Sequence, residues 1–238
     1  MKTPDGLPPS VRWVTAPDRD TLAANLAVHV ADQLREQLAA QARVSLAVSG
    51  GSTPVPFFSA LAGQALPWSR VDVTLVDERW VDADHEASNA RLVRTHLLTG
   101  EAQQARWVPL KAEGATPAAA LDEVEQRVRT LAWPLSVVVL GMGNDGHTAS
   151  LFPGSPGLAE ALDPSGPARV AATRPQDAPH ERITLTASAL LAARHRVLHI
   201  TGEDKLATLE RALANPDAVA EMPVRLFLKQ PLTVFWCP

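Results

Sequence analysis

The sequence predicts one α/β domain, built on a single doubly wound, mainly parallel sheet with helices on both faces, as in Rossmann-like folds. Short runs rich in β-branched residues carry little charge, which is typical of buried parallel strands, at residues 44–48, 71–76, 135–140, 197–201 and 233–236. Helical patterns long enough to cross over the sheet separate most of these runs. This alternation indicates a doubly wound fold.

The first predicted helix begins near Asp18 or Asp20 and has an apolar residue at every fourth position from 22 to 38. Further helices are expected around residues 55–61, 89–98, 118–131 and 204–213. Residues 153–167 are rich in proline and glycine, and we expect a long loop there. We treat residues 1–238 as one domain, with residues 1–10 as a flexible tail.

Composition excludes several classes of protein. A net charge of −4 and a pI near 6.0 argue against binding along a nucleic-acid backbone. The single cysteine, Cys237, forms no internal disulfide, and the chain has neither an apolar run of ~18 residues nor a secretion signal. We expect a cytoplasmic protein without a membrane or nucleic-acid partner. His195 and His199 have helical metal-ligand spacing, but they lie in a predicted strand, so no metal is expected.

Ligands of doubly wound sheets bind at the carboxyl ends of the strands. The first such loop has the sequence SGGSTP at residues 49–54, between a strand and a helix. Gly50 and Gly51 allow a close approach of backbone N–H groups, and the hydroxyls of Ser52 and Thr53 add donors near a helix N-terminus. These features favour phosphate binding, although a tight turn with a Ser or Thr N-cap is an equal alternative.

The second loop begins with Asp77, Glu78 and Arg79 and leads to Ser88 and Asn89 at the start of a helix. An arginine fork there would bind phosphate, and carboxylates would accept hydrogen bonds from sugar hydroxyls. The alternative is a solvated turn in which Ser88 is only an N-cap.

The third loop, GMGNDGHT at residues 141–148, matches the glycine pattern of a dinucleotide-binding turn. Pro153 and Pro156 interrupt the helix that such a site requires, so no nucleotide cofactor is expected. Around Gly143, the loop instead places Asp145 two residues before His147. A carboxylate can orient an imidazole, and a neutral imidazole serves as a general base near neutral pH.

Arg182 and Lys205 are two further cationic candidates, because each starts or follows a strand-like run and could point into a shared cleft. Taken singly, either is more often a surface charge.

Together these motifs resemble the 6-phosphogluconolactonase branch of the glucosamine-6-phosphate isomerase/6-phosphogluconolactonase family. The resemblance extends from about Val44 to Lys205, and its most specific part is the stretch from Gly141 to Pro153. It implies the fold of the isomerases and hydrolysis of 6-phosphoglucono-δ-lactone in the oxidative pentose phosphate pathway, without metal or nucleotide. After His147, the sequence TASLF departs from the isomerase pattern and fits the lactonases.

The mechanism expected from this resemblance has His147 as the base, oriented by Asp145. The Ser52–Thr53 turn, Arg79, Arg182 and Lys205 hold the phosphate of a small sugar-phosphate lactone. Alternatives are an isomerase or deaminase using Asp77 or Glu78, a non-catalytic sugar-phosphate sensor, and serine hydrolysis through Ser52. We expect a monomer or a weak homo-oligomer.

Overall fold

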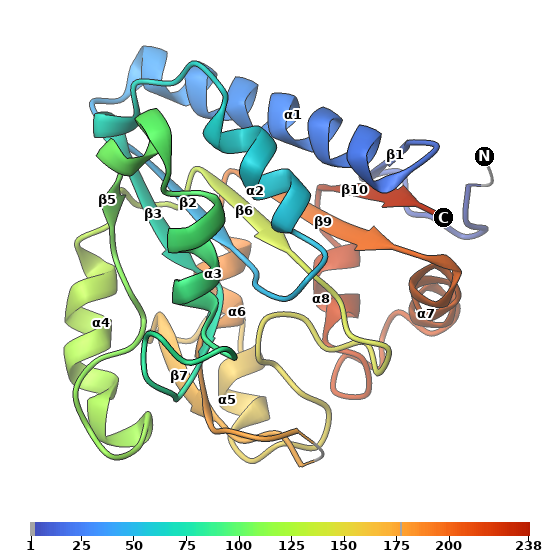
Figure 1. The fold of residues 1–238 in the computed structure, drawn as a ribbon. Coiled ribbons are helices and arrows are strands. Elements are labelled where there is room, and N and C mark those ends of the chain that lie inside the picture. Colours follow the sequence, from blue (N-terminus) through green and yellow to red (C-terminus); the bar gives the residue numbers. More distant parts are fainter. Residues whose placement is uncertain (1–2, 177) are drawn as a thin grey trace.

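The computed structural model describes residues 3–176 and 178–238. Its main sheet has seven parallel strands in the order β1-β10-β9-β6-β2-β3-β5 (Figure 1). Their bounds are β1 Val11–Thr15, β2 Val44–Val48, β3 Val71–Leu75, β5 Arg106–Trp107, β6 Val137–Leu140, β9 His195–Thr201 and β10 Leu232–Cys237. The predicted doubly wound parallel sheet is therefore confirmed.

Helices cover both faces of this sheet, as the side chains of β9 show. His195 Nε2 lies 3.4 Å from Gln37 Nε2 in helix α1 (Arg19–Ala40). Its neighbour Arg196 donates to the carbonyl of Leu191, the last residue of helix α6 (Ala187–Leu191), and to that of Ala193 just beyond it. Because successive strand residues point to opposite faces, α1 and α6 lie on opposite sides of the sheet (Figure 1). The α-helices are α1 Arg19–Ala40, α2 Val55–Ala62, α3 Asn89–His96, α4 Leu121–Arg129, α5 Leu158–Leu162, α6 Ala187–Leu191, α7 Glu203–Ala214 and α8 Val224–Leu228.

The long helix α1 follows its sequence signals closely. The carboxylate of Asp18, its N-cap, accepts from Thr21 N at 2.7 Å. The five periodic apolar residues are buried against the sheet: Leu22, Leu26, Val30, Leu34 and Leu38.

A second sheet of three antiparallel strands, in the order β4-β8-β7, was absent from the sequence prediction. It consists of β4 Asp77–Arg79, β7 Val170–Thr173 and β8 Arg182–Leu185. Val76 alone separates β3 from β4; its N–H donates to Val48 O, and its carbonyl accepts from Leu185 N. This residue therefore joins the two sheets.

Two other expectations need correction. The segment 153–167 is not entirely loop, because Leu158 and Ala161 are buried and carry the short helix α5. The helix expected at 118–131 begins with a 3₁₀ turn, Ala118–Ala120, before α4. Two further 3₁₀ turns span Trp68–Arg70 and Gly100–Gln104.

Part of the expected N-terminal tail contacts the domain: Pro4 is buried and Leu7 packs against the core. Residues 1 and 2 of that expectation lie outside the described residues. Among the described helices, none combines the length and apolar character needed to cross a bilayer.

Charged side chains tie together the amino ends of three strands. Asp72, at the start of β3, has a side chain only 1% exposed and accepts from Arg43 and Arg106. Burial alone would raise the pKa of Asp72, but the hydrogen bonds and charges of the two arginines lower it below its ordinary value. This cluster lies at the opposite end of the strands from the cavity described next.

Candidate active site

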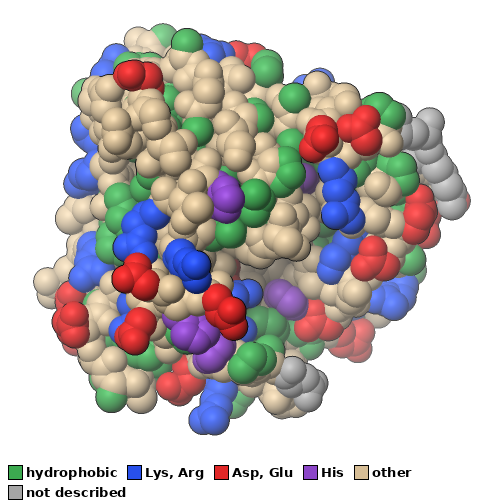
Figure 2. Space-filling view, viewed as in Figure 1, with side chains coloured by type: hydrophobic (Ala, Val, Ile, Leu, Met, Phe, Trp, Pro, Cys, Tyr) green, Lys and Arg blue, Asp and Glu red, His purple; other side chains and the backbone are tan. Residues whose placement is uncertain are grey.

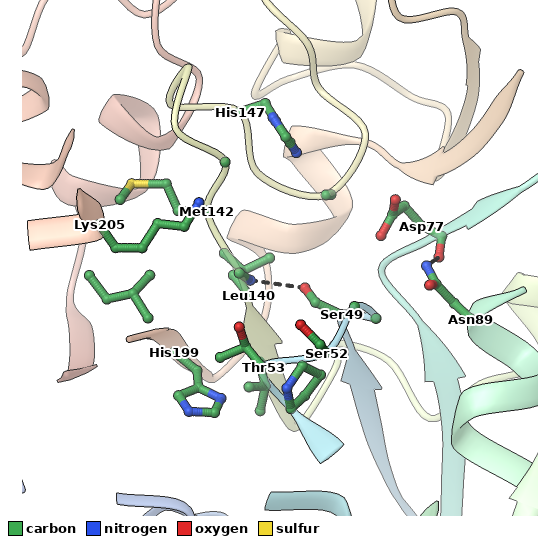
Figure 3. Close-up of a pocket in the computed structure, with 18 of the residues that line it drawn as sticks. Ser49, Ser52, Thr53, Asp77, Asn89, Leu140, Met142, His147, His199 and Lys205 are labelled. Atoms are coloured by element: carbon green, nitrogen blue, oxygen red, sulfur yellow. Dashed lines mark hydrogen bonds between the residues drawn. The ribbon is translucent and has the colours of Figure 1, made fainter. Parts of the chain in front are cut away.

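A cavity of about 360 Å³ opens at the carboxyl ends of β2, β3, β6 and β9 (Figure 3). In the space-filling view, a hollow near the middle of the face has basic and histidine side chains along part of its border (Figure 2). Ten of the predicted site residues line the cavity: Gly50, Gly51, Ser52, Thr53, Asp77, Arg79, Asn89, Gly143, His147 and Lys205. The position of the cavity follows from the topology, because the carboxyl ends of parallel strands meet at one edge.

The SGGSTP loop forms the floor between β2 and α2. Gly51 has a φ of +92°, a conformation that glycine adopts without strain. Ser49 Oγ accepts from Gly141 N at 2.9 Å, which fastens this loop to the one that carries His147. The hydroxyls of Ser52 and Thr53 lie near Ser49 and line the same part of the cavity (Figure 3).

Glu78 organises the opposite wall from within the protein. Its buried carboxylate accepts from the backbone N–H groups of Arg79, Asn89 and Ala90 and from the Ser88 hydroxyl. Burial raises the pKa of Glu78 above its ordinary value, although the backbone donors oppose that shift. With its oxygens occupied by four donors, Glu78 fixes the start of α3 and does not face the cavity.

Asp77, in contrast, lines the cavity. Its Oδ2 accepts from Ser150 Oγ at 2.6 Å, and its backbone carbonyl accepts from Asn89 Nδ2 at 3.0 Å. Figure 3 shows Asp77 and Asn89 on the side of the cavity opposite Lys205. This wall therefore offers oxygen acceptors suited to sugar hydroxyls, and the far side offers a cation.

His147 and Asp145 form a hydrogen-bonded pair at the rim. Nδ1 of His147 lies 2.6 Å from Asp145 Oδ1, which also accepts from His147 N at 3.1 Å. Burial alone would raise the pKa of Asp145, but the hydrogen bond and charge of His147 outweigh it, so this pKa lies below its ordinary value. The carboxylate is therefore charged near neutral pH and favours the tautomer with the proton on Nδ1, which leaves Nε2 as a base.

The loop bearing this pair is tightly held. Gly143 N donates to His147 O at 2.9 Å, and a side chain at Gly143 would place a Cβ 2.2 Å from the imidazole. From α7, Arg211 Nη2 donates to Asn144 O at 2.7 Å. The loop geometry therefore depends on both its own glycine and a neighbouring helix.

The predicted cations lie in different places. Lys205, in the first turn of α7, and Arg79 both line the cavity, and Arg79 Nη1 also donates to Ala87 O at 2.8 Å. Arg182 is not among the lining residues; its side chain is buried, and Nη1 donates to the carbonyls of Pro179 and His180. The structure therefore brings Arg79 and Lys205, but not Arg182, to the cavity surface.

Sequence reasoning missed the roles of Ser150 and Phe152. Ser150 binds Asp77, and the Phe152 ring lies 4.3 Å from the imidazole of His147, centroid to centroid. Both belong to the stretch that carried the family resemblance, but only the fold shows their partners. His199 also lines the cavity, and burial lowers its pKa to about 4. In the part of the chain that the structure describes, no three His, Cys, Asp or Glu side chains are grouped to hold a metal.

Comparison with known proteins agrees with this geometry. A family model described as glucosamine-6-phosphate isomerases/6-phosphogluconolactonase matches residues 17–236. The chain belongs to this family. A 6-phosphogluconolactonase from Pseudomonas aeruginosa is 47% identical over 238 residues, covering 100% of this chain and 98% of that protein. A 6-phosphogluconolactonase from Pseudomonas putida is 45% identical over 232 residues, which cover 98% of this chain and 95% of that protein.

Solved structures place the chain in the same family. A crystal structure of a 6-phosphogluconolactonase from Shewanella baltica has a TM-score of 0.92 and 44% identity, covering 96% of this chain and 98% of that one. A monomeric glucosamine-6-phosphate deaminase has a TM-score of 0.76 at 17% identity, a likeness that concerns the fold alone. The family resemblance predicted from the motifs is thus confirmed, and it lies on the lactonase side.

Proposed function

We propose that this protein hydrolyses 6-phospho-D-glucono-1,5-lactone to 6-phospho-D-gluconate, as the names of its full-length relatives suggest. The observation that carries the proposal is the 2.6 Å contact between His147 Nδ1 and Asp145 Oδ1, because it leaves Nε2 free to accept a proton at the cavity rim. The substrate is a small sugar-phosphate lactone, and the reaction needs neither a nucleotide nor a metal.

In the proposed reaction, Nε2 of His147 removes a proton from water while the water oxygen bonds to the lactone carbonyl carbon. The bond from that carbon to the ring oxygen then breaks, and the imidazolium returns its proton to the departing oxygen. General-base assistance of this kind contributes roughly 10²–10⁴-fold. Backbone N–H groups of the loop around Gly143 are the proposed donors to the developing oxyanion.

The other end of the substrate is held by charge. We place the phosphate at the Ser52–Thr53 turn, where the amino end of α2 and the ammonium of Lys205 favour an anion. Asp77 and Asn89 then face the sugar hydroxyls, and Arg79 supplies further positive charge. Binding energy at the phosphate fixes the carbonyl near His147 and contributes to the rate through position.

An isomerase or deaminase is a weaker candidate. Such a reaction would move a carbon-bound proton with a carboxylate, but the four donors around Glu78 leave it unsuited to that role. Asp77 remains able to act, so turnover of glucosamine 6-phosphate is the discriminating assay. We expect the enzyme to hydrolyse the lactone and to leave glucosamine 6-phosphate unchanged.

The direct test follows lactone loss by pH-stat with the wild type and His147→Ala, each with and without a chelator. We expect wild-type hydrolysis that the chelator leaves unchanged and a rate at least ~100-fold lower in the variant. A chelator-sensitive rate, or a His147→Ala enzyme with undiminished activity, contradicts the mechanism. A covalent serine inhibitor added to the wild type tests the alternative through Ser52, and we expect it to have no effect.

A further inference from the structure

The His147 imidazole needs more support than its hydrogen bond to Asp145 provides. Its side chain is 29% exposed, and the contact with Asp145 fixes the ring at the single atom Nδ1. A ring held at one atom can still tilt, which would turn Nε2 away from a bound lactone. Because a base must be held close to its productive geometry, the faces and edges of the ring also have to be restrained.

Phe152 supplies that restraint. Its ring centroid lies 4.3 Å from the imidazole centroid, with the planes inclined by 38°. The Phe152 carbonyl accepts from both the backbone N–H and the hydroxyl of Ser155, at 3.2 and 2.9 Å, which fixes the backbone beneath the ring. The backbone of Gly143 also packs against the imidazole, because a Cβ at Gly143 would lie 2.2 Å from the Cε1 and Nδ1 atoms of the ring. The imidazole is therefore packed by Phe152 and by the backbone of Gly143.

Arg182 in turn contacts Phe152. Its Cζ lies 5.9 Å from the centroid of the Phe152 ring, within the range of a cation–π contact. Its Nη1 donates to the carbonyls of Pro179 and His180, both at 2.6 Å, and the residue is only 5% exposed. The guanidinium is thus anchored to backbone and to an aromatic ring, outside the cavity lining.

The pairing of Arg182 with Arg79 separates the roles of two neighbouring cations. They lie opposite each other in the β4–β8 ladder, where like charges repel. Burial first, and then the charge of Arg79, lower the pKa of Arg182 below its ordinary value. Arg79 lines the cavity and Arg182 does not, so only Arg79 is placed to meet the substrate.

We propose that Phe152 and Arg182 are positioning residues that hold the His147 imidazole in its productive orientation, with Arg182 acting through Phe152 and not on the phosphate. The proposal rests on the proposed function, since it takes His147 as the base. It also revises the phosphate-binding role that the sequence predicted for Arg182.

Two substrates separate positioning from phosphate binding. We would measure kcat/KM for 6-phosphoglucono-1,5-lactone and for glucono-1,5-lactone, which lacks the phosphate, with Phe152→Leu and Arg182→Gln. A positioning residue affects both substrates, so we expect kcat/KM to fall by the same factor on each, about 10- to 100-fold. Phe152→Tyr, which keeps the aromatic ring, should retain most of the activity. A loss confined to the phosphorylated lactone would overturn the proposal.

A matched control is available in Arg169, whose Cζ lies 4.8 Å from the centroid of the Trp133 ring, away from the cavity lining. Arg169→Gln removes the same kind of contact and should leave kcat/KM unchanged on both substrates. Thermal unfolding of every variant identifies losses caused by misfolding. Arg182→Lys, which keeps the charge but not the planar guanidinium, provides a second variant and should also lose activity on both lactones.

A spectroscopic measurement reads the orientation directly. The ring current of Phe152 displaces the NMR resonance of the proton on Cε1 of His147. This resonance can be assigned because it disappears in His147→Ala. Phe152→Leu removes the ring current itself, so the informative variant is Arg182→Gln, which keeps the Phe152 ring. We expect Arg182→Gln to shift this resonance, and an unshifted resonance in the folded Arg182→Gln variant contradicts the proposal. If the wild type hydrolyses neither lactone, the proposed function fails, while the resonance still decides whether these residues position the ring.

Discussion

Gly50 and Asn89 are in such close contact that a Cβ at Gly50 would lie 1.9 Å from Asn89 Oδ1. The SGGSTP loop and the start of α3 are therefore fitted to each other at this point. Gly50→Ala should displace Asn89, cost about 1–3 kcal/mol of unfolding free energy and lower kcat/KM. Chemical denaturation and lactonase assays measure both effects.

Gly63→Ala is the control for this substitution, because its Cβ would meet nothing closer than 3.6 Å and its φ of −79° suits alanine. We expect it to keep full activity. Wild-type stability and activity in Gly50→Ala would show that Asn89 moves aside without consequence.

Asp145→Asn tests the orientation of the imidazole from its other side. An amide can donate to Nδ1 and so favours the tautomer with the proton on Nε2, which cannot accept a proton from water. We expect kcat to fall roughly 10²–10⁴-fold with little change in KM. Asp163→Asn is the control, because Asp163 makes a similar local contact with Ser165 N on the surface. An active Asp145→Asn enzyme would exclude the tautomer argument.

Lys205→Met tests the place of the phosphate. Removal of one charged donor should raise KM for the phosphorylated lactone about 10- to 100-fold, with kcat nearly unchanged and glucono-1,5-lactone unaffected. Lys229→Met, which removes an exposed partner of Asp217, should leave the kinetics unchanged. Equal losses on both lactones would place Lys205 away from the phosphate.

The Asp72 cluster predicts an effect of pH on stability without an effect on catalysis. The pKa of Asp72 is lower in the folded protein than its ordinary value of 3.8, so its stabilisation is present above pH 3.8 and is lost as the pH falls toward the folded-state pKa. Asp72→Asn should cost about 2–3 kcal/mol at pH 7, less than a fully buried pair because both arginines are partly exposed.

Urea denaturation of the wild type and Asp72→Asn between pH 7 and pH 3 measures this effect. The difference in unfolding free energy between the wild type and Asp72→Asn should become smaller as the pH falls, and kcat at pH 7 should be the same in both proteins. Asp32→Asn, which removes an exposed ion pair with Arg35, is the control and should cost less than ~1 kcal/mol. A pH-independent difference would show that Asp72 contributes through packing and not through its charge.

The main sheet was predictable because β2, β3 and β6 are buried throughout, and because α1 combines an Asp18 cap with periodic apolar residues. The strand β5 has only two residues, and β4 is a run of three charged residues, so neither produces the pattern on which strand prediction depends. The small sheet therefore required the three-dimensional structure. The loop carrying Leu158 was misread because its prolines and glycines outweighed a five-residue helix.

The site was predictable to the extent that its residues follow strand ends. His147, Asp77 and Lys205 do so, and the cavity brings them together. Arg182 also lies at a strand end, but on the antiparallel sheet, where the rule for parallel strands does not apply. The aromatic contact between Phe152 and the imidazole has no spacing signal, because it depends on how the chain turns after Thr148.

The junction at Val76 joins two sheets that each carry part of the cavity lining. Asp77 belongs to the small sheet, whereas the loops that carry His147 and Ser52 follow strands of the large one. Substitutions that tilt one sheet against the other would change the distance between Asp77 and His147 across the cavity, while both side chains stay in place on their own elements. We therefore expect the fit of a ring in the cavity to depend on the packing between the two sheets as well as on the residues that line it.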